Sequence, residues 1–324
     1  MIKKVFIGAA FLLLSASITQ SVSAQSIIPQ PESITRQQGT FTLAKGLQGV
    51  TNLKGKDFKI LNQYTSDVMN IPFSSVKNPS ADAPLRLICT GTAQEAAMAA
   101  DSVSLQGYEL NVTPTAVTIQ ARTPMGLFYG LQTLRQLEKD RQIPCVKITD
   151  TPRFAYRGLM IDCSRHFWSS DEIKKQLDAM AYFKLDRFHW HLTDGGGWRM
   201  EVKQYPLLTE ETAYRTESDW TKWWNGKNRQ YSPDPDRLVC WKGMNIHGGY
   251  YTQDDIKEIV DYAAARHITI IPEIEMPGHS DEVVYAYPEL SCTGKPYTQS
   301  DLCVGKEQTY TFMENVLKEV MQLF

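Results

Sequence analysis

The sequence predicts an α/β protein in which an α+β domain, residues 25–150, precedes the first part of a (β/α)8 TIM barrel, residues 151–324. Three observations lead to this fold class. Strand-like and helix-like patterns alternate after Pro152, which implies a parallel sheet. Polar residues follow the end of each apolar strand, as they do at the catalytic face of a barrel. No G-x-G-x-x-G motif follows the first of these strands, which counts against a dinucleotide-binding fold.

The first domain mixes strands and helices. Residues 85–89 are typical of a short strand, and the alternating segments 108–112 and 116–121 flank Thr113-Pro114-Thr115, which predicts a β-hairpin. Apolar residues then recur at helical spacing and predict one amphipathic helix; they are Met125, Phe128, Leu131, Leu134 and Leu137. The domain carries no obvious catalytic cluster in its sequence, so we interpret it as an accessory domain.

The second block contains three strand–helix units. A continuous apolar run predicts a strand over residues 158–163, a second strand is predicted over 187–192, and a third, buried strand over 268–274. Ser169 with Glu172, and Thr252 with Asp255, resemble the capping boxes that open helices. A long polar insertion with several tryptophans, from about residue 216 to 249, separates the second strand from its helix. Apolar spacing predicts a last helix close to the final residue; it includes Phe312, Val316, Leu317 and Val320.

Reactive side chains follow each predicted strand. Arg165 and His166 follow the first strand, Asp194 follows the second, and Glu275 and His279 follow the third. A complete barrel needs roughly 250 residues, whereas only about 170 follow the start of this block. The sequence therefore supplies about three of the eight units, and we interpret it as a fragment of a barrel.

The N-terminus predicts export. Lys3 and Lys4 precede a short apolar run, and Val22-Ser23-Ala24 resembles a signal-peptidase site, so residues 1–24 are interpreted as a signal peptide. The protein is expected to be periplasmic or secreted, with no transmembrane anchor. The formal net charge is only −2 and basic runs are absent, which argues against nucleic acid as a partner.

Six cysteines in an exported chain permit disulfides. Cys292 and Cys303 flank one short loop and make the most plausible pair. The other four are far apart in the sequence and are expected to be buried singly; they are Cys89, Cys145, Cys163 and Cys240. No C-x-x-C spacing occurs, so the sequence does not predict a structural zinc site.

The segment FHWHLTDGGGWR, residues 188–199, carries the densest chemistry. His189 and His191 are two residues apart on a strand and therefore share one face. Such a pair could bind zinc or iron with Asp194 or His279 as a further ligand. The alternative is that the histidines are hydrogen-bonded packing residues of the barrel.

Two further interpretations concern the glycines and the aromatic residue. Gly195-Gly196-Gly197 lacks the Lys-Ser/Thr of a phosphate loop and opens no convincing helix, so phosphate binding is disfavoured. Three glycines would more simply allow a tight turn and the approach of a ligand to the backbone. Arg165, Asp194, Trp198 and His279 offer the charged groups and the aromatic face that hold a neutral sugar, although a tryptophan is more often a core residue.

Three segments in this order resemble the β-N-acetylhexosaminidases of glycoside hydrolase family 20. They are RGLMIDCSRHFWS at 157–169, FHWHLTDGGGWR at 188–199 and IIPEIEMPGHS at 270–280. Tyr205-Pro206-Leu207-Leu208-Thr209 and the segment YPELSCTG are also similar to the family, and residues 25–150 look like its N-terminal α+β domain. The resemblance covers essentially the whole mature chain.

The resemblance implies roles for three residues. Arg165 matches the arginine that binds hydroxyls of the terminal sugar. Asp194 and His279 match a relay that orients the general-acid glutamate and tunes its pKa. The family motif usually reads Asp-Asp-Gln-Gly-Trp, whereas this chain has Gly195 and Gly196 at the second and third positions. This departure is expected to loosen the loop.

The resemblance also implies a mechanism. The general acid and an aspartate that orients the acetamido group form an adjacent Asp-Glu pair, which would lie just beyond Phe324. The substrate's acetamido oxygen attacks the anomeric carbon in place of a protein carboxylate. The expected activity is release of terminal β-linked N-acetylhexosamine from oligosaccharides or glycoconjugates, with no cofactor or metal. A truncated, non-catalytic sugar-binding remnant and a metal-dependent TIM-barrel hydrolase are the alternatives.

Overall fold

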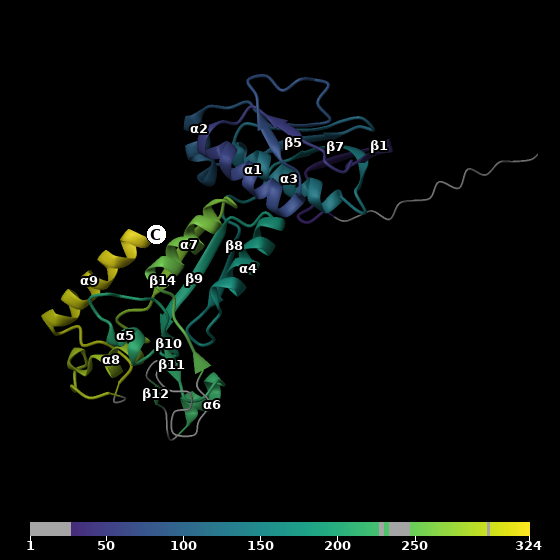
Figure 1. The fold of residues 1–324 in the computed structure, drawn as a ribbon. Coiled ribbons are helices and arrows are strands. Elements are labelled where there is room, and N and C mark those ends of the chain that lie inside the picture. The colour runs from purple at the N-terminus through teal and green to yellow at the C-terminus, as the bar shows by residue number, and fades with distance from the viewer. Residues whose placement is uncertain (1–26, 227–229, 233–246, 297–298) are drawn as a thin grey trace, which may run out of the picture.

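The structure is a computed structural model that describes residues 27–226, 230–232, 247–296 and 299–324. An N-terminal α+β domain is followed by a partial α/β barrel (Figure 1). The predicted signal peptide and Cys240 lie outside the described residues. Within those ranges, none of the helices combines the length and the apolar character needed to cross a bilayer.

The N-terminal domain is built on a mixed sheet with the strand order β1-β7-β5-β6-β4-β2-β3. Its strands are β1 (Ser33–Thr42), β2 (Gly49–Thr51), β3 (Phe73–Ser75), β4 (Leu85–Cys89), β5 (Tyr108–Val112), β6 (Val117–Ala121) and β7 (Gln142–Asp150). Its helices are α1 (Gly55–Met69), α2 (Ala93–Met98) and α3 (Pro124–Leu137). The predicted strand 85–89 is confirmed, and so is the hairpin, in which Tyr108 pairs with Ala121 and Val112 with Val117.

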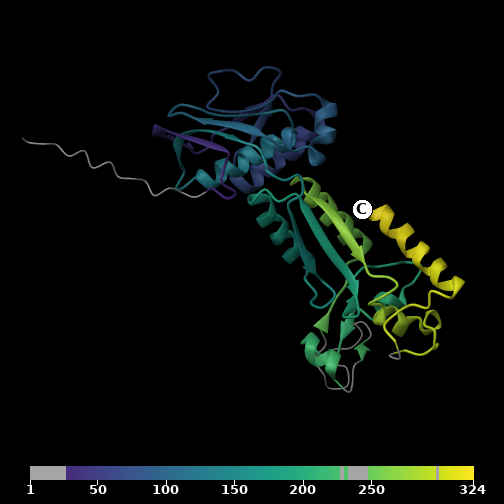
Figure 2. The ribbon, with the colours of Figure 1, turned by 180° about the vertical axis from the view of Figure 1, so that it is seen from behind.

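Helix α3 lies between this sheet and the second domain. The Thr123 side chain accepts a hydrogen bond from the Gly126 N–H, and Pro124 occupies the first turn, where its missing donor costs nothing. The helix is almost entirely buried, because it contacts β5 and β6 on one side and α1 and α4 on the other. Both views place α1 and α3 on the face of the sheet nearer the barrel (Figure 1 and Figure 2).

The second domain contains three parallel strands in the order β8-β9-β14. The strands and the long helices that follow them are β8 (Gly158–Asp162), α4 (Ser170–Tyr182), β9 (Arg187–Asp194), α7 (Gln253–Ala264), β14 (Thr269–Ile274) and α9 (Glu307–Leu323). Ser169 with Glu172, and Thr252 with Asp255, form the expected capping boxes of α4 and α7. The fold is the first part of a TIM barrel preceded by an α+β domain.

Smaller elements surround the ends of these strands. They are β10 (Gly197–Trp198), α5 (Leu207–Glu210), β11 (Tyr214–Arg215), α6 (Trp220–Asn225), β12 (Tyr231–Ser232), β13 (His247–Gly248) and α8 (Asp281–Ala286). In the predicted polar insertion, β11 pairs with both β12 and β13 in a small antiparallel sheet. Residues 227–229 and 233–246 of that insertion lie outside the described residues.

Polar contacts join the two domains near the N-terminal ends of the barrel strands. Lys184 Nζ lies 3.3 Å from Asp150 Oδ2 and 3.0 Å from the Tyr108 hydroxyl. Arg157 Nη2 donates to the Tyr129 hydroxyl of α3 at 2.9 Å. These groups are largely buried. Separating the domains there would leave a buried charge without its partner, which is unfavourable.

Two of the three barrel strands are less buried than their sequences predict. On β8, Leu159 is 37% exposed and Met160 is 50% exposed, and β14 is half-buried along most of its length. The prediction of a buried strand is therefore wrong for β14, and the apolar character of β8 is not matched by burial. The reason is positional, because β9 has a strand on each side, whereas β8 and β14 each pair only with β9 among the described strands.

Candidate active site

The three residues assigned to the site from the sequence meet at one carboxylate oxygen. Arg165 follows β8, Asp194 ends β9, and His279 lies in the turn after β14. Arg165 Nη2 lies 2.7 Å from Asp194 Oδ2, and His279 Nδ1 lies 2.9 Å from the same atom. Parallel strands end at one edge of a sheet, so residues distant in the sequence converge there.

Asp194 is the buried centre of this group, with 3% of its surface exposed. Its second carboxylate oxygen accepts the Gly195 N–H at 2.7 Å. Burial alone would raise the pKa of Asp194, but hydrogen bonds from His191 and His279 and the charge of Arg165 outweigh burial and lower the pKa. Asp194 is therefore an ionised carboxylate at neutral pH.

His279 has a backbone φ of 51°, in the left-handed region that few non-glycine residues adopt. Its hydrogen bond to Asp194 and the negative charge of that residue raise the pKa of His279, and Glu275 acts in the same direction. The side chain is 63% exposed. An imidazole that is anchored at Nδ1 and still accessible to a ligand can hold or pass a proton.

Arg165 lies between two carboxylates. Its Nη1 is 2.9 Å from Asp162 Oδ2, while Nη2 binds Asp194, and its guanidinium carbon lies 5.8 Å from the centre of the Trp220 ring. The side chain keeps 29% of its surface exposed. A guanidinium has five N–H donors in a fixed fork, so these two contacts leave others to bind hydroxyls.

The sequence prediction did not include Asp162 or Glu273, which lie on either side of His191 in the sheet. In the strand register, Asp162 on β8 and Glu273 on β14 are both opposite His191 on β9. The sequence signal was available. Asp162 ends its apolar strand, and Glu273 lies within β14, two residues before Glu275. Burial raises the pKa of Glu275, and its contact with Glu273 raises it further.

The H-x-H pair contacts carboxylates. His189 Nε2 lies 2.6 Å from Glu273 Oε2, and His191 Nδ1 lies 3.3 Å from the same oxygen. Two groups of side chains here have ligand atoms close enough to share a metal ion, His191 with Glu273 and Glu275, and Asp194 with Glu275 and His279. Within the described residues neither group contains both histidines, so the predicted ligand set based on that pair is not assembled.

Trp198 is a core residue, which the sequence analysis gives as the more frequent case, and not an aromatic face of the site. The side chain is fully buried, and its indole N–H donates to the Met200 carbonyl at 2.6 Å. The ring that lies beside Arg165 belongs instead to Trp220 of α6. Sequence alone does not separate these two tryptophans, because both lie near apolar and charged residues.

The three glycines are needed for packing against the protein itself. A Cβ on Gly196 would lie 2.8 Å from the Ser164 carbonyl oxygen, and one on Gly195 would lie 2.8 Å from Asp281 Oδ2. In place of the expected approach of a ligand to the backbone, these glycines allow two loops of the protein to pack closely. Gly197 has a φ of 149°, which also favours glycine.

Two buried arginines bind the backbone of this loop. The glycines at the second and third motif positions were expected to loosen it, but these contacts hold it in place. Arg199 donates to the carbonyl oxygens of Cys163, Ser164 and Gly196, among others. Arg215 donates to Gly196 O at 2.9 Å and to Arg165 O at 2.8 Å. Burial lowers the pKa of Arg199 to about 10, so its guanidinium stays charged at neutral pH.

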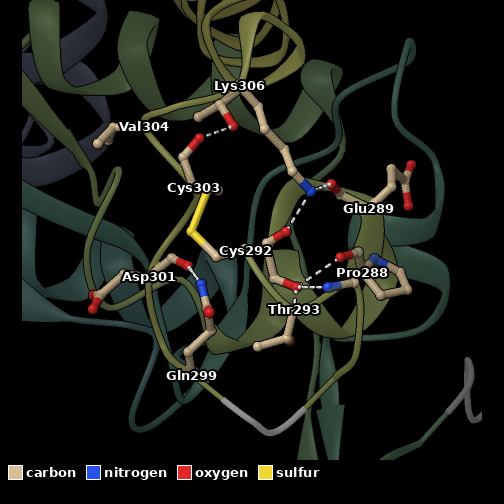
Figure 3. The surroundings of a disulfide bond; sticks show 12 residues. Pro288, Glu289, Cys292, Thr293, Gln299, Asp301, Cys303, Val304 and Lys306 are labelled. Atoms are coloured by element: carbon tan, nitrogen blue, oxygen red, sulfur yellow. Dashed lines mark hydrogen bonds between the residues drawn. A yellow bond between two sulfur atoms is a disulfide. The ribbon is translucent and has the colours of Figure 1, made fainter.

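The predicted disulfide between Cys292 and Cys303 is confirmed (Figure 3). Lys306 fixes the start of the enclosed loop, because its ammonium group donates to Glu289 O at 2.7 Å and to Ser291 O at 2.6 Å. Of the remaining cysteines within the described ranges, Cys145 and Cys163 are buried as expected. Cys89 is only half-buried, because it ends its strand.

Comparison with known proteins agrees with this geometry. The profile described as "Glycosyl hydrolase family 20, catalytic domain" matches residues 154–324, and "Glycosyl hydrolase family 20, domain 2" matches residues 24–151. The chain belongs to glycosyl hydrolase family 20. The resemblance found in the three sequence segments is thus confirmed.

Several family 20 relatives are named β-hexosaminidases. A protein of Porphyromonas gingivalis is 41% identical over 68% of this chain and 28% of its own length. One of Vibrio furnissii is 32% identical over 92% of this chain and 47% of its own length. The chain therefore spans less than half the length of these two curated relatives.

Solved family 20 structures share the fold. A β-N-acetylhexosaminidase of Bacteroides fragilis superposes with a TM-score of 0.72 at 30% identity, covering 93% of this chain and 55% of that one. The Streptomyces plicatus N-acetyl-β-hexosaminidase, solved in complex with Thio-NAglucal, gives a TM-score of 0.72 at 31% identity, with 92% and 57% covered. The fold prediction is confirmed by these likenesses.

Proposed function

We propose that this family 20 chain forms part of an exo-acting β-N-acetylhexosaminidase that releases terminal GlcNAc or GalNAc with retention of configuration. The observation that carries the proposal is the Asp194 carboxylate, which binds Arg165 on one side and His279 on the other. A guanidinium that binds hydroxyls beside a carboxylate–imidazole pair suits a neutral sugar and an acid-catalysed bond cleavage.

Arg165 binds hydroxyls of the terminal sugar in this proposal. Its contacts with Asp162 and Asp194 fix the plane of the guanidinium before a ligand arrives. A fixed fork loses little conformational entropy on binding and can donate to two hydroxyls at once.

Asp194 and His279 support the general acid. The ionised Asp194 anchors Nδ1 of His279, which leaves the other ring nitrogen available to the general acid in this proposal. The acid itself and the aspartate that orients the acetamido group are, in this proposal, an adjacent Asp-Glu pair that we expect after residue 324. The substrate's acetamido oxygen then attacks the anomeric carbon as the leaving oxygen is protonated.

The proposal extends to the location of the protein. The signal-peptide pattern of residues 1–24 supports export to the periplasm or the medium, where glycans and glycoconjugates are available. Cell fractionation with N-terminal sequencing of the mature protein tests this step. Retention of the first 24 residues on a cytosolic protein would contradict it.

The test of function uses the protein expressed from its complete coding sequence. We expect turnover of p-nitrophenyl N-acetyl-β-glucosaminide or its galacto-epimer, and no turnover of the matching β-glucoside, which lacks the acetamido group. A trifluoroacetamido substrate should react more slowly, because fluorine withdraws electrons from the attacking oxygen. Failure of well-folded protein to cleave either acetamido substrate contradicts the proposal.

A further inference from the structure

The second histidine of the H-x-H pair is buried among groups that can only accept hydrogen bonds. His191 is 5% exposed. Its Nε2 lies 2.9 Å from the Thr193 carbonyl oxygen and 3.4 Å from Asp194 Oδ2, and its Nδ1 lies 3.3 Å from Glu273 Oε2. The bond to the Thr193 carbonyl oxygen requires a hydrogen on Nε2, and the negative charge of Glu273 beside Nδ1 favours a second hydrogen on the ring.

Charges from three strands act on this ring. Asp162 on β8, Glu273 on β14 and Asp194 on β9 all favour its protonated form, and together they outweigh the opposing effect of burial. Two other basic side chains contact the same carboxylates. Arg165 binds Asp162 and Asp194, and His189 binds Glu273.

The two histidines of the pair differ in their contacts and in their exposure. Both contact Glu273, but only His191 also reaches Asp194. His189 is the more exposed of the two, with 35% of its side chain accessible against 6% for His191. A change at His189 therefore provides a matched control for a change at His191, on the same strand and the same face.

We propose that His191 is a positioning residue that keeps Asp194 ionised and turned toward His279, with Glu273 holding the His191 ring in place. The inference rests on the proposed function for its catalytic consequence. Its structural part, the dependence of Asp194 on His191, can be measured without any substrate.

The physical reason is the burial of Asp194. A carboxylate removed from water needs compensating donors and positive charge, and each one it loses favours the neutral carboxylic acid. A neutral Asp194 can no longer stabilise a protonated His279. The charge of His191 would therefore affect the general acid through Asp194 and His279.

The experiment compares His191→Gln with His189→Gln in the complete protein. Glutamine keeps an N–H donor near the position of Nε2 but carries no charge. Carbon-13 NMR of the side-chain carboxyl groups gives the pKa of Asp194. We expect it to rise by about one unit or more in His191→Gln, as for loss of an opposite charge within 4–6 Å, and to stay close to the wild-type value in His189→Gln.

A second readout separates positioning from a purely structural role. In His191→Gln the acid limb of the kcat profile should move to higher pH while KM changes little, and His189→Gln should keep the wild-type profile. If His191→Gln does not fold, Glu273→Gln serves instead. It removes the carboxylate beside Nδ1 of His191, which favours the charged ring. The direct loss of that negative charge would lower the pKa of Asp194, so a rise in this variant would report the lost charge of His191 and a fall would contradict the positioning role.

The outcomes distinguish the two proposals. An unchanged Asp194 pKa in folded His191→Gln, or an equal rise in His189→Gln, overturns the positioning role. A raised Asp194 pKa in His191→Gln would support the positioning role even if the wild-type protein cleaves no hexosaminide, and that lack of cleavage would contradict the proposed activity.

Discussion

The Ser280 N–H donates to the Ser300 carbonyl oxygen at 2.7 Å, which ties the turn carrying His279 to the loop closed by the disulfide. A second bond of the same kind runs from the Leu302 N–H to the Pro277 carbonyl oxygen at 2.8 Å. The two bonds lie on either side of His279, whose left-handed backbone has to be held by its surroundings. The Cys292–Cys303 loop therefore supports the histidine that pairs with Asp194.

Removing the disulfide should reduce activity before it unfolds the protein. In the double variant Cys292→Ser/Cys303→Ser the loop gains conformational freedom, so the two backbone bonds and the His279–Asp194 contact should form less often. We expect lower kcat at temperatures well below the midpoint of unfolding. Cys89→Ser, which changes a half-buried thiol in the other domain, is the control. Wild-type kcat in the double variant would show that the loop does not support His279.

Gly196→Ala should be strongly destabilising. The added methyl would lie 2.8 Å from the Ser164 carbonyl oxygen and 3.0 Å from the Arg165 Cα, both of which are backbone atoms. Overpacking of this kind costs about 1–3 kcal/mol and should displace Arg165. Gly305→Ala is the control, because open space surrounds that position. Urea titrations of the two variants measure the difference, and equal midpoints would mean that the two loops separate easily.

Arg165→Lys should weaken the binding of substrate and of competitive inhibitors without unfolding the protein. Lysine keeps the charge but loses the fork, so it cannot contact Asp162, Asp194 and a sugar together. Leaving buried hydroxyls unpaired should cost about 1–3 kcal/mol for each group. Steady-state kinetics and inhibitor titration test this. Wild-type KM, kcat and inhibitor affinity would exclude contact between Arg165 and the sugar.

The His279–Asp194 pair should stabilise the fold over a limited pH range. The pKa of His279 is raised from its ordinary 6.5, so its contribution is full below 6.5 and is lost as pH rises through the raised value. The pKa of Asp194 is lowered from 3.8, so its contribution is present above 3.8 and is lost as pH falls through the lowered value. The stability difference between wild type and His279→Gln should therefore be largest between these two ordinary values.

Chemical denaturation at a series of pH values measures that difference. Asp178→Asn is a suitable comparison, because it removes a carboxylate that pairs with Arg266 away from this site. A difference for His279→Gln that stays constant from acid to alkaline pH would contradict the ion pair.

Local chemistry explains which features the sequence could predict. The capping boxes at Ser169 and Thr252 depend on residues three apart, and the hairpin depends on alternation around one turn. The meeting of Arg165 and Asp194 follows from the geometry of parallel strands, because Arg165 lies shortly after β8 and Asp194 ends the neighbouring β9.

The remaining features depend on tertiary packing. Trp198 and Trp220 have no local signal that distinguishes a core ring from one beside an arginine. Arg199 and Arg215 bind backbone carbonyl oxygens, which every residue carries, so no sequence pattern marks their partners. Glu273 lies within an apparent strand, but its contact with His191 follows from the register between β14 and β9, which no local pattern gives.

Residues 25–324 expressed alone should have poor stability and no hydrolase activity. The exposed Leu159 and Met160 of β8 and the half-buried β14 leave apolar surface of the described sheet in contact with water, which favours aggregation. Arg165, Asp194 and His279 would be present, but the family resemblance places the general acid and the acetamido-orienting aspartate after residue 324. His279 is the one of these three that could act as a weak acid, but its Nδ1 is occupied by Asp194.

Calorimetry and hydrolysis of p-nitrophenyl N-acetyl-β-glucosaminide measure the stability and the activity of residues 25–324. Sharp cooperative unfolding of both domains, together with turnover near that of intact relatives, would require a different acid within these residues.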